Sequence, residues 1–206
     1  MTLTIPDRLA RFVIALTLLY RRARYGYAFR RIPLTQGKYA IVDPDDFERL
    51  SKYKWHAVKD TYTFYAVRHK RVGKKYLSLG MHRDVLHPPG HLVVDHINHN
   101  GLDNRKANLR LATYAQNACN RRQFRKRKTS KYTGVSWRQY RKQWCAVICH
   151  KKKNIRLGYF DNEIQAAKAY DKAAKKYHGE FASLNFPDSP RRAPRTTKKN
   201  EQARKK

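Results

Sequence analysis

The sequence contains few acidic residues. It has 15 Asp and Glu against 47 Lys and Arg, so its formal net charge is +32. Such an excess of positive charge attracts polyanions, so the composition predicts a nucleic acid as the partner. A ribosome-associated protein and a protein of the membrane surface are the alternatives.

Cysteine is scarce as well. The 3 cysteines are unevenly spaced, which excludes the disulfide framework of a small secreted protein and fits a reducing compartment. Cys145 and Cys149 would face the same side of a strand, but no second pair follows that would complete a zinc site.

The N-terminal region lacks an apolar run of membrane length. Residues 12–20 (FVIALTLLY) are apolar, but a transmembrane helix needs roughly 20 such residues. Arginines follow this run and no small-residue cleavage site is present, which argues against a signal peptide. We interpret residues 1–31 as a basic amphipathic segment whose helix docks on the body or lies along DNA. A peripheral membrane contact is an alternative, and no stable membrane association is expected.

Basic residues gather in two segments that do not predict a fold of their own. Residues 121–128 (RRQFRKRK) include six Lys or Arg, and we interpret residues 123–131 as a basic linker that follows phosphates. Residues 188–206 are rich in Pro, Thr, Lys and Arg, which predicts a disordered tail. The candidate phosphate contacts of the first segment are Arg121, Arg122, Arg125, Lys126, Arg127 and Lys128.

Residues 32–90 predict a small α+β region. Short apolar or alternating runs indicate strands at residues 38–42, 55–58, 62–68 and 76–79. Asp43-Pro44 opens a short helix through residue 50, and residues 82–86 predict one or two helical turns before Pro88-Pro89-Gly90.

Residues 132–187 predict three strands and one helix. Asp161-Asn162 caps the helix, which continues to about residue 177. Its buried stripe consists of Ala167, Tyr170, Ala174 and Tyr177. Apolar residues alternate at period two in three strands, at Val135 and Trp137, at Trp144, Ala146 and Ile148, and at Ile155, Leu157 and Tyr159. Basic and aromatic side chains on such a ribbon suit a DNA major groove, and the candidates are Arg138, Arg141, Lys142, Trp144 and Arg156.

A carboxylate, an imidazole and several amides gather in residues 93–122 (VVDHINHNGLDNRKANLRLATYAQNACNRR). An apolar strand ends in Asp95-His96, the turn-forming residues NHNGLDNR follow, and residues 108–112 predict a second strand. Thr113 and Gln116 match a capping box, which begins a helix that carries Asn117. Strand, loop, strand and helix together predict a ββα unit at residues 91–122.

These residue types suit metal-assisted chemistry on a phosphodiester. A carboxylate binds a hard cation, and a neutral imidazole accepts a proton from water. Neighbouring residues of a regular strand point to opposite faces, so Asp95 and His96 share a site only if the strand ends or bulges there. Strand-end polar groups without any chemistry are the alternative interpretation.

The phrase VDHINHNGLDNRKANLR resembles the HNH endonuclease motif, in the H-N-N version of homing nucleases. The resemblance implies that Asp95 and Asn117 bind one divalent metal ion and that His96 is the general base. It also implies that Asn108 fixes the loop and orients the histidine. Carboxylate and amide oxygens favour Mg²⁺ or Mn²⁺ over zinc.

Residues 132–187 resemble the Apetala-two/ethylene-response-factor (AP2/ERF) domain. The similar phrases are YTGV, WCA, LGYF and LNFP, together with the alanine-rich helix. The resemblance implies a three-stranded antiparallel sheet that enters the major groove, with the helix behind it. Ser136 and Val147 stand near positions where that family places an Arg and a Glu, so the family's target sequence is not carried over.

The whole arrangement resembles mobile HNH endonucleases with a C-terminal AP2/ERF-like domain. We expect a metal-dependent endonuclease for double-stranded DNA in a cytoplasmic, nucleoid-associated setting of bacterial or phage type. One site per chain cuts one strand at a time, so a double-strand break needs a dimer or two successive events. The alternatives are a sequence-specific DNA-binding regulator with an inactive nuclease unit, and a ribosomal or other RNA-binding protein.

Overall fold

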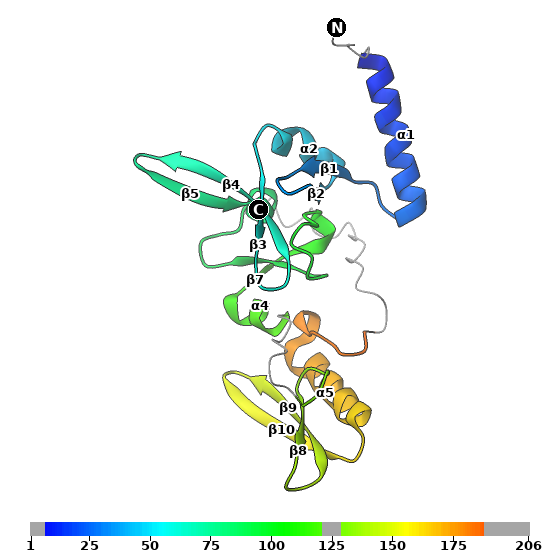
Figure 1. Ribbon diagram of the computed structural model, residues 1–206, viewed down its shortest axis with the longest axis vertical. Helices are drawn as coiled ribbons and strands as arrows, with labels where there is room; N and C mark the ends of the chain where they lie inside the picture. Colours follow the sequence, from blue (N-terminus) through cyan, green and yellow to red (C-terminus); the bar gives the residue numbers. More distant parts are fainter. Residues whose placement is uncertain (1–6, 121–128, 188–206) are drawn as a thin grey trace, which may run out of the picture. The chain divides into compact units, whose positions relative to one another are not determined.

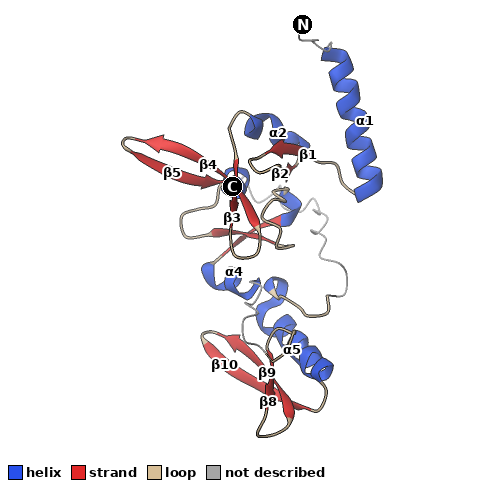
Figure 2. Cartoon of the chain, viewed as in Figure 1, coloured by secondary structure: helices blue, strands red, loops and turns tan. Residues whose placement is uncertain are grey.

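The computed structural model describes residues 7–120 and 129–187, and its contacts divide the chain into two units. Of the described residues, 7–87 and 100–110 form the first unit, and 88–99, 111–120 and 129–187 form the second. Figure 1 follows the chain by colour, and Figure 2 distinguishes helices from strands. Helices and small antiparallel sheets occur in both units, which confirms the predicted α+β class.

The first unit begins with an exposed helix, α1 (Asp7–Tyr25). None of its residues is buried, so the predicted docking on the body is limited to its C-terminal end. There the Arg21 guanidinium donates to the Phe29 carbonyl at 2.6 Å and lies 4.5 Å from the Phe29 ring centre. No helix among the described residues is long and apolar enough to cross a membrane.

Two small sheets build the body of the first unit. The hairpin of β1 (Arg30–Pro33) and β2 (Tyr39–Val42) is followed by α2 (Pro44–Ser51), and β1 is a strand that the sequence analysis did not predict. The second sheet has the order β3-β4-β5, formed by β3 (His56–Lys59), β4 (Phe64–Val72) and β5 (Lys75–Gly80). Helix α3 (Met81–Leu86) follows directly. The core of this unit includes Ile32, Ala40, Val42, Leu50, Trp55, Ala57, Ala66 and Met81.

Residues 100–110 are held on this body although they lie far from β2 in the sequence. The backbone of Ile41 accepts from Asn104 and donates to the Leu102 carbonyl, both at 2.8 Å. The Asp103 carboxylate receives two bonds from Arg105, at 2.7 and 2.5 Å, and both side chains are buried. The same guanidinium lies 3.4 Å from the centre of the Tyr27 ring. This segment therefore belongs to the packed interior, and it contains the 3-10 turn η1 (Lys106–Asn108).

The acidic residues at the start of α2 form the other attachment of this segment. The Asp43 carboxylate accepts from the backbone N–H of Lys106 at 2.8 Å. The Asp46 carboxylate lies 2.8 Å from both the Lys106 ammonium and the Arg49 guanidinium. Burial alone would raise the pKa of Asp46, but these two cations lower it below its usual value. Carboxylates gathered in the sequence thus serve as an anchor for residues 100–110.

The second unit contains the predicted three-stranded sheet and helix. Strands β8 (Val135–Arg138), β9 (Gln143–His150) and β10 (Lys153–Phe160) lie in the order β10-β9-β8, and α5 (Glu163–His178) packs on one face (Figure 2). The Asn162 side chain caps α5 by accepting from Ile164 N–H at 2.7 Å, as predicted. Gly179 ends the helix with a φ of 55°, and η2 (Gly179–Phe181) follows.

The predicted alternation in β10 is wrong at its last residue. The pairing register shifts between Arg156 and Gly158, which is a β-bulge. Beyond it Tyr159 pairs with Cys145, whereas Ile155 pairs with the core residue Ile148. Tyr159 therefore lies on the face away from α5, and Phe160 packs against the core in its place.

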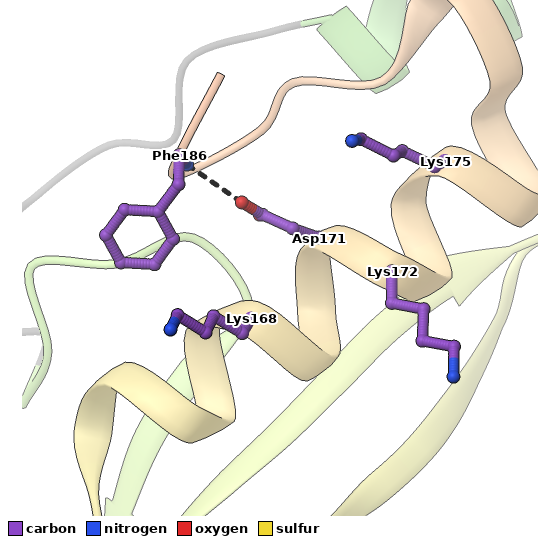
Figure 3. A pocket seen from close by; sticks show the side chains of 5 residues that line it. All are labelled: Lys168, Asp171, Lys172, Lys175 and Phe186. Atoms are coloured by element: carbon purple, nitrogen blue, oxygen red, sulfur yellow. Dashed lines mark hydrogen bonds between the residues drawn. The ribbon is translucent and has the colours of Figure 1, made fainter. Parts of the chain in front are cut away.

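The segment after η2 closes the second unit. The Asp171 carboxylate accepts from the backbone N–H groups of Asn185 and Phe186, both at 2.8 Å. Figure 3 shows the bond to Phe186. The Asn185 side chain in turn binds the backbone of Thr133 through both its oxygen and its nitrogen. Gly134 must be glycine, because its φ is 74° and an added Cβ would lie 2.0 Å from the Tyr170 ring.

We predict that Arg105→Ala destabilises the first unit. The substitution leaves the Asp103 carboxylate buried without its guanidinium, a loss worth roughly 3 to 5 kcal/mol for buried pairs. Urea unfolding followed by circular dichroism measures the change in the free energy of unfolding. Arg83→Ala, at an exposed position of α3, is the matched control and should change it by less than about 0.5 kcal/mol. Equal effects of the two substitutions would contradict this role of Arg105.

Candidate functional site

Strand β6 (Val93–His96) ends at the candidate residues. Asp95 and His96 are its last two residues, and they are 5% and 6% exposed. The strand ends here because a turn follows, in which His99 N–H donates to the His96 carbonyl at 3.0 Å. The condition under which the two side chains can share a site is therefore met.

The predicted ββα unit is present. Strand β6 forms a two-stranded sheet with β7 (Leu109–Ala112), and α4 (Tyr114–Asn120) follows. The capping box is reciprocal: the Thr113 hydroxyl accepts from Gln116 N–H at 3.2 Å, and the Gln116 side chain accepts from Thr113 N–H at 2.8 Å. The cap fixes where the helix begins, and hence which of its residues face β6.

Asn120 is a functional candidate that the sequence analysis missed. Its side-chain nitrogen lies 2.9 and 3.0 Å from the two carboxylate oxygens of Asp95 and 3.2 Å from the His96 carbonyl oxygen. The residue is 2% exposed. One amide thus fixes the carboxylate and the adjoining backbone together. The available signal was the spacing from Asn117, since residues three apart lie on one face of a helix.

The other two candidate residues occupy different surroundings. Asn117 is half-buried, lies one helical turn before Asn120, and belongs to a helix that contacts β6. Asn108 is fully buried in the first unit, where its side chain donates to the Asp103 carbonyl at 2.8 Å. Asn108 thus ties residues 100–110 together, while its predicted effect on the orientation of His96 stays a prediction.

The donor chemistry fits a hard divalent cation. Among residues 7–120 and 129–187 no group of three or more His, Cys, Asp or Glu side chains gathers as a metal site. The candidate donors are instead the Asp95 carboxylate and an amide oxygen of α4, which suit Mg²⁺ or Mn²⁺ better than zinc. So few protein ligands leave positions for water and phosphate oxygens, as is usual for Mg²⁺.

A second candidate surface is the face of the β8–β10 sheet away from α5. Arg138 and Arg156 are exposed on this face, opposite Gln143 and Val147 of β9. Their register places them with Tyr159, which the sequence analysis had assigned to the other face.

The Tyr159 ring organises the basic side chains around it. The guanidinium carbons of Arg141 and Arg156 lie 4.5 and 5.5 Å from its centre. Its hydroxyl lies 3.0 Å from that of Tyr140, in the turn between β8 and β9 that also contains Lys142. Four exposed basic residues and two tyrosines thus lie on this face of the sheet or in the turn beside it, a composition that suits phosphate and base contacts.

Trp144 lies apart from this cluster. It packs against the core formed by Val135, Ala146 and α5, and its ring centre is 5.2 Å from that of Trp137. The contact of Trp144 with DNA stays a prediction, and the packing of this side chain against the core does not favour it. The predicted contacts at residues 121–128, and the predicted tail at 188–206, lie outside the described residues.

Comparison with known proteins identifies the family. The model of the HNH endonuclease family matches residues 87–119. An uncharacterized HNH endonuclease of Acanthamoeba polyphaga mimivirus is 34% identical over 156 residues, which are 73% of this chain and 76% of the viral protein. The chain belongs to the HNH endonuclease family.

The C-terminal part of this HNH endonuclease family member is an AP2-like domain. Dehydration-responsive element-binding protein 2D of Arabidopsis thaliana is 45% identical over 67 residues, 32% of each protein. An AP2-like ethylene-responsive transcription factor of the same plant is 41% identical over 59 residues, 29% of this chain and 12% of its own length. The similarity to the plant proteins thus covers one domain.

We predict that Asn120→Ala weakens metal binding at Asp95. The carboxylate loses the amide that orients it, and comparable losses around metal ligands lower affinity by about 10- to 100-fold. Titration with Mn²⁺ followed by electron paramagnetic resonance measures the dissociation constant directly, without any cleavage. Gln165→Ala, on the exposed side of α5, is the control and should leave it unchanged. Undiminished Mn²⁺ binding by the Asn120 variant would refute this positioning role.

Proposed function

We propose that this protein is a metal-dependent endonuclease that hydrolyses phosphodiester bonds of double-stranded DNA. The observation that carries the proposal is the buried arrangement at the end of β6, where Asn120 of α4 holds Asp95 beside His96. It lies within or directly beside the residues that match the HNH family model. The combination with an AP2-like domain supports an enzyme of the mobile or homing type.

In this proposal each residue has one task. His96 accepts a proton from the attacking water, and the turn that follows β6 fixes its backbone. Asp95 and Asn117 hold one Mg²⁺ or Mn²⁺ ion, and Asn120 keeps the carboxylate in a single orientation. When bound, the ion supplies positive charge that stabilises the transition state and the leaving oxygen. Asn108 keeps residues 100–110 in place.

The AP2-like domain supplies the DNA contacts in this proposal. The sheet face away from α5 and the turn beside it carry four positive charges and two tyrosine hydroxyls, and the basic residues are Arg138, Arg141, Lys142 and Arg156. A three-stranded sheet of this kind reaches base edges in the major groove while the arginines bind phosphates and guanines. A DNA-binding regulator that does not cut is the second candidate, and the similarity to plant transcription factors favours it. Only cleavage separates the two.

We predict that His96→Ala lowers the rate of plasmid nicking by roughly 10²- to 10⁴-fold. Supercoiled plasmid is incubated with Mg²⁺ or Mn²⁺, and nicked product is measured on gels. Wild-type activity should vanish in EDTA and should fall as the pH drops, since the general base must be neutral.

The control for that experiment is His91→Ala, at an exposed position of the same unit, which should nick at the wild-type rate. DNA affinity in EDTA should be equal for all three proteins. Nicking by the His96 variant at the wild-type rate would remove His96 from the mechanism. If the wild type itself never nicks DNA but still binds it, the regulator is the correct function.

We predict that the double variant Arg138→Ala/Arg156→Ala binds duplex DNA with a weaker salt dependence than the wild type. The slope of the logarithm of the binding constant against the logarithm of the salt concentration should be smaller by about two units, since each lost phosphate contact removes about one unit. Fluorescence anisotropy in EDTA at several salt concentrations measures it. The double variant Lys168→Ala/Lys172→Ala removes the same charge from the opposite side of the domain and should have a smaller effect. Equal losses would mean that only net charge matters.

A further inference from the structure

The β4–β5 hairpin extends beyond the body of the first unit as a two-stranded ribbon (Figure 1). Every residue from 69 to 78 is exposed, on both faces of the ribbon. Tyr76 is 69% exposed, and Val72 and Leu77 are about half exposed. A two-stranded ribbon with nothing packed on either face is only marginally stable in water. The exposed aromatic and apolar side chains of the outer part of the hairpin therefore indicate a surface that binds a partner.

The outer part of the ribbon is strongly basic. Lys70, Arg71, Lys74 and Lys75 lie around its turn, and no acidic residue occurs from residue 61 to residue 83. The strands pair in register, so Arg71 lies opposite Tyr76 and Lys70 lies opposite Leu77. Positive charge therefore extends over both faces, with hydrogen-bonding groups and a few apolar side chains between.

The base of the ribbon is firmly packed. Arg68 donates to the Asp84 carboxylate at 2.7 Å, and its guanidinium lies 4.1 Å from the centre of the Tyr53 ring. Just beyond it the Ser78 hydroxyl and a His69 ring nitrogen lie 3.3 Å apart. At the tip Gly73, with a φ of 59°, makes the tight turn that joins the strands. The ribbon is thus fixed at one end and open at the other.

We infer that this ribbon is a second DNA-binding element, which enters the major groove of duplex DNA from the first unit. The inference rests on the proposed function. Residues 69–72 add about 14 Å of length at roughly 3.4 Å per residue, and a major groove about 12 Å wide and 8.5 Å deep admits a two-stranded ribbon. A second copy of the chain would bring like charges together, which disfavours self-association through this element.

The consequence is recognition at two places. The AP2-like sheet contacts DNA through the second unit, which also contains Asp95 and His96, and the ribbon contacts DNA through the first unit. Two linked contacts bind more tightly than either alone, because the second binding event is intramolecular. Sequence preference is then shared between the units, with Arg71, Tyr76 and Ser78 as the base-contacting candidates of the ribbon.

The test compares two triple variants of the full-length chain that remove the same charge. The ribbon variant is Lys70→Gln/Lys74→Gln/Lys75→Gln, and the control is Lys168→Gln/Lys172→Gln/Lys175→Gln on α5. The control residues line a pocket of about 340 Å³ on the side of α5 away from its sheet (Figure 3). Binding to a random-sequence duplex is measured in EDTA over a range of salt concentrations. Circular dichroism verifies that both variants fold.

We expect the salt dependence of duplex binding to fall by about two to three units in the ribbon variant and by less than about one unit in the control. Equal losses in the two variants, or an unchanged ribbon variant, would overturn the inference. So would a ribbon variant that loses affinity for single-stranded DNA or for anionic phosphatidylserine vesicles but keeps its affinity for duplex.

Failure of this inference and failure of the proposed function give different results. The binding assay contains EDTA and needs no cleavage, so the ribbon can be confirmed in a protein that never nicks DNA. Conversely, a ribbon variant that shows metal-dependent nicking and an unaltered salt dependence of binding would support the nuclease function and contradict DNA binding by the ribbon. If the ribbon variant unfolds, Tyr76→Ala tests the ribbon without changing charge. It should weaken duplex binding at a fixed salt concentration, whereas Tyr114→Ala, also at an exposed tyrosine, should leave it unchanged. Equal affinities of the two variants would overturn the inference.

Discussion

The fold depends on where its few carboxylates lie, because each of them can form ion pairs or hydrogen bonds in a chain with a large excess of positive charge. With 15 acidic and 47 basic side chains, the folded chain repels itself wherever opposite charges are not brought together. Several of the acids lie where one segment must be attached to another. Asp103 and Asp46 hold residues 100–110, Asp84 holds the base of the β4–β5 ribbon, and Asp171 holds the segment after η2. The remaining basic surface stays available for a polyanion.

The candidate site follows a different rule from these anchors. Asp95 is held by the neutral amide of Asn120, which orients the carboxylate without adding a positive charge of its own. A guanidinium in that position would compete with a metal ion for the same oxygens. The distinction separates the carboxylates that stabilise the fold from the one that the proposed chemistry uses. It also explains why a short helix with a well-defined beginning matters, since the cap at Thr113 determines where Asn120 lies.

The sequence predicted what short-range interactions determine. The capping box at Thr113, the cap at Asn162 and the end of β6 at His96 depend on residues within a few positions of one another, and all three are present. The anchoring of residues 100–110 and the contact between Asn120 and Asp95 depend on partners far away in the chain. Helical periodicity places Asn120 on the same face as Asn117, but it does not identify Asp95 as its partner. The roles of Asn108 and Asn117 follow from family resemblance rather than from any pattern in the chain.

The bulge in β10 constrains how this domain can change. Because side chains alternate along a strand, the extra residue between Arg156 and Gly158 exchanges the faces of all residues that follow it. Removing that residue would bury Tyr159 and expose Phe160, which would empty the core beside α5 and remove Tyr159 from the basic face in one step. Changes of strand length by an even number would preserve both. We therefore expect β10 to tolerate the gain or loss of an even number of residues only. Insertions of any length are expected in the β9–β10 turn instead.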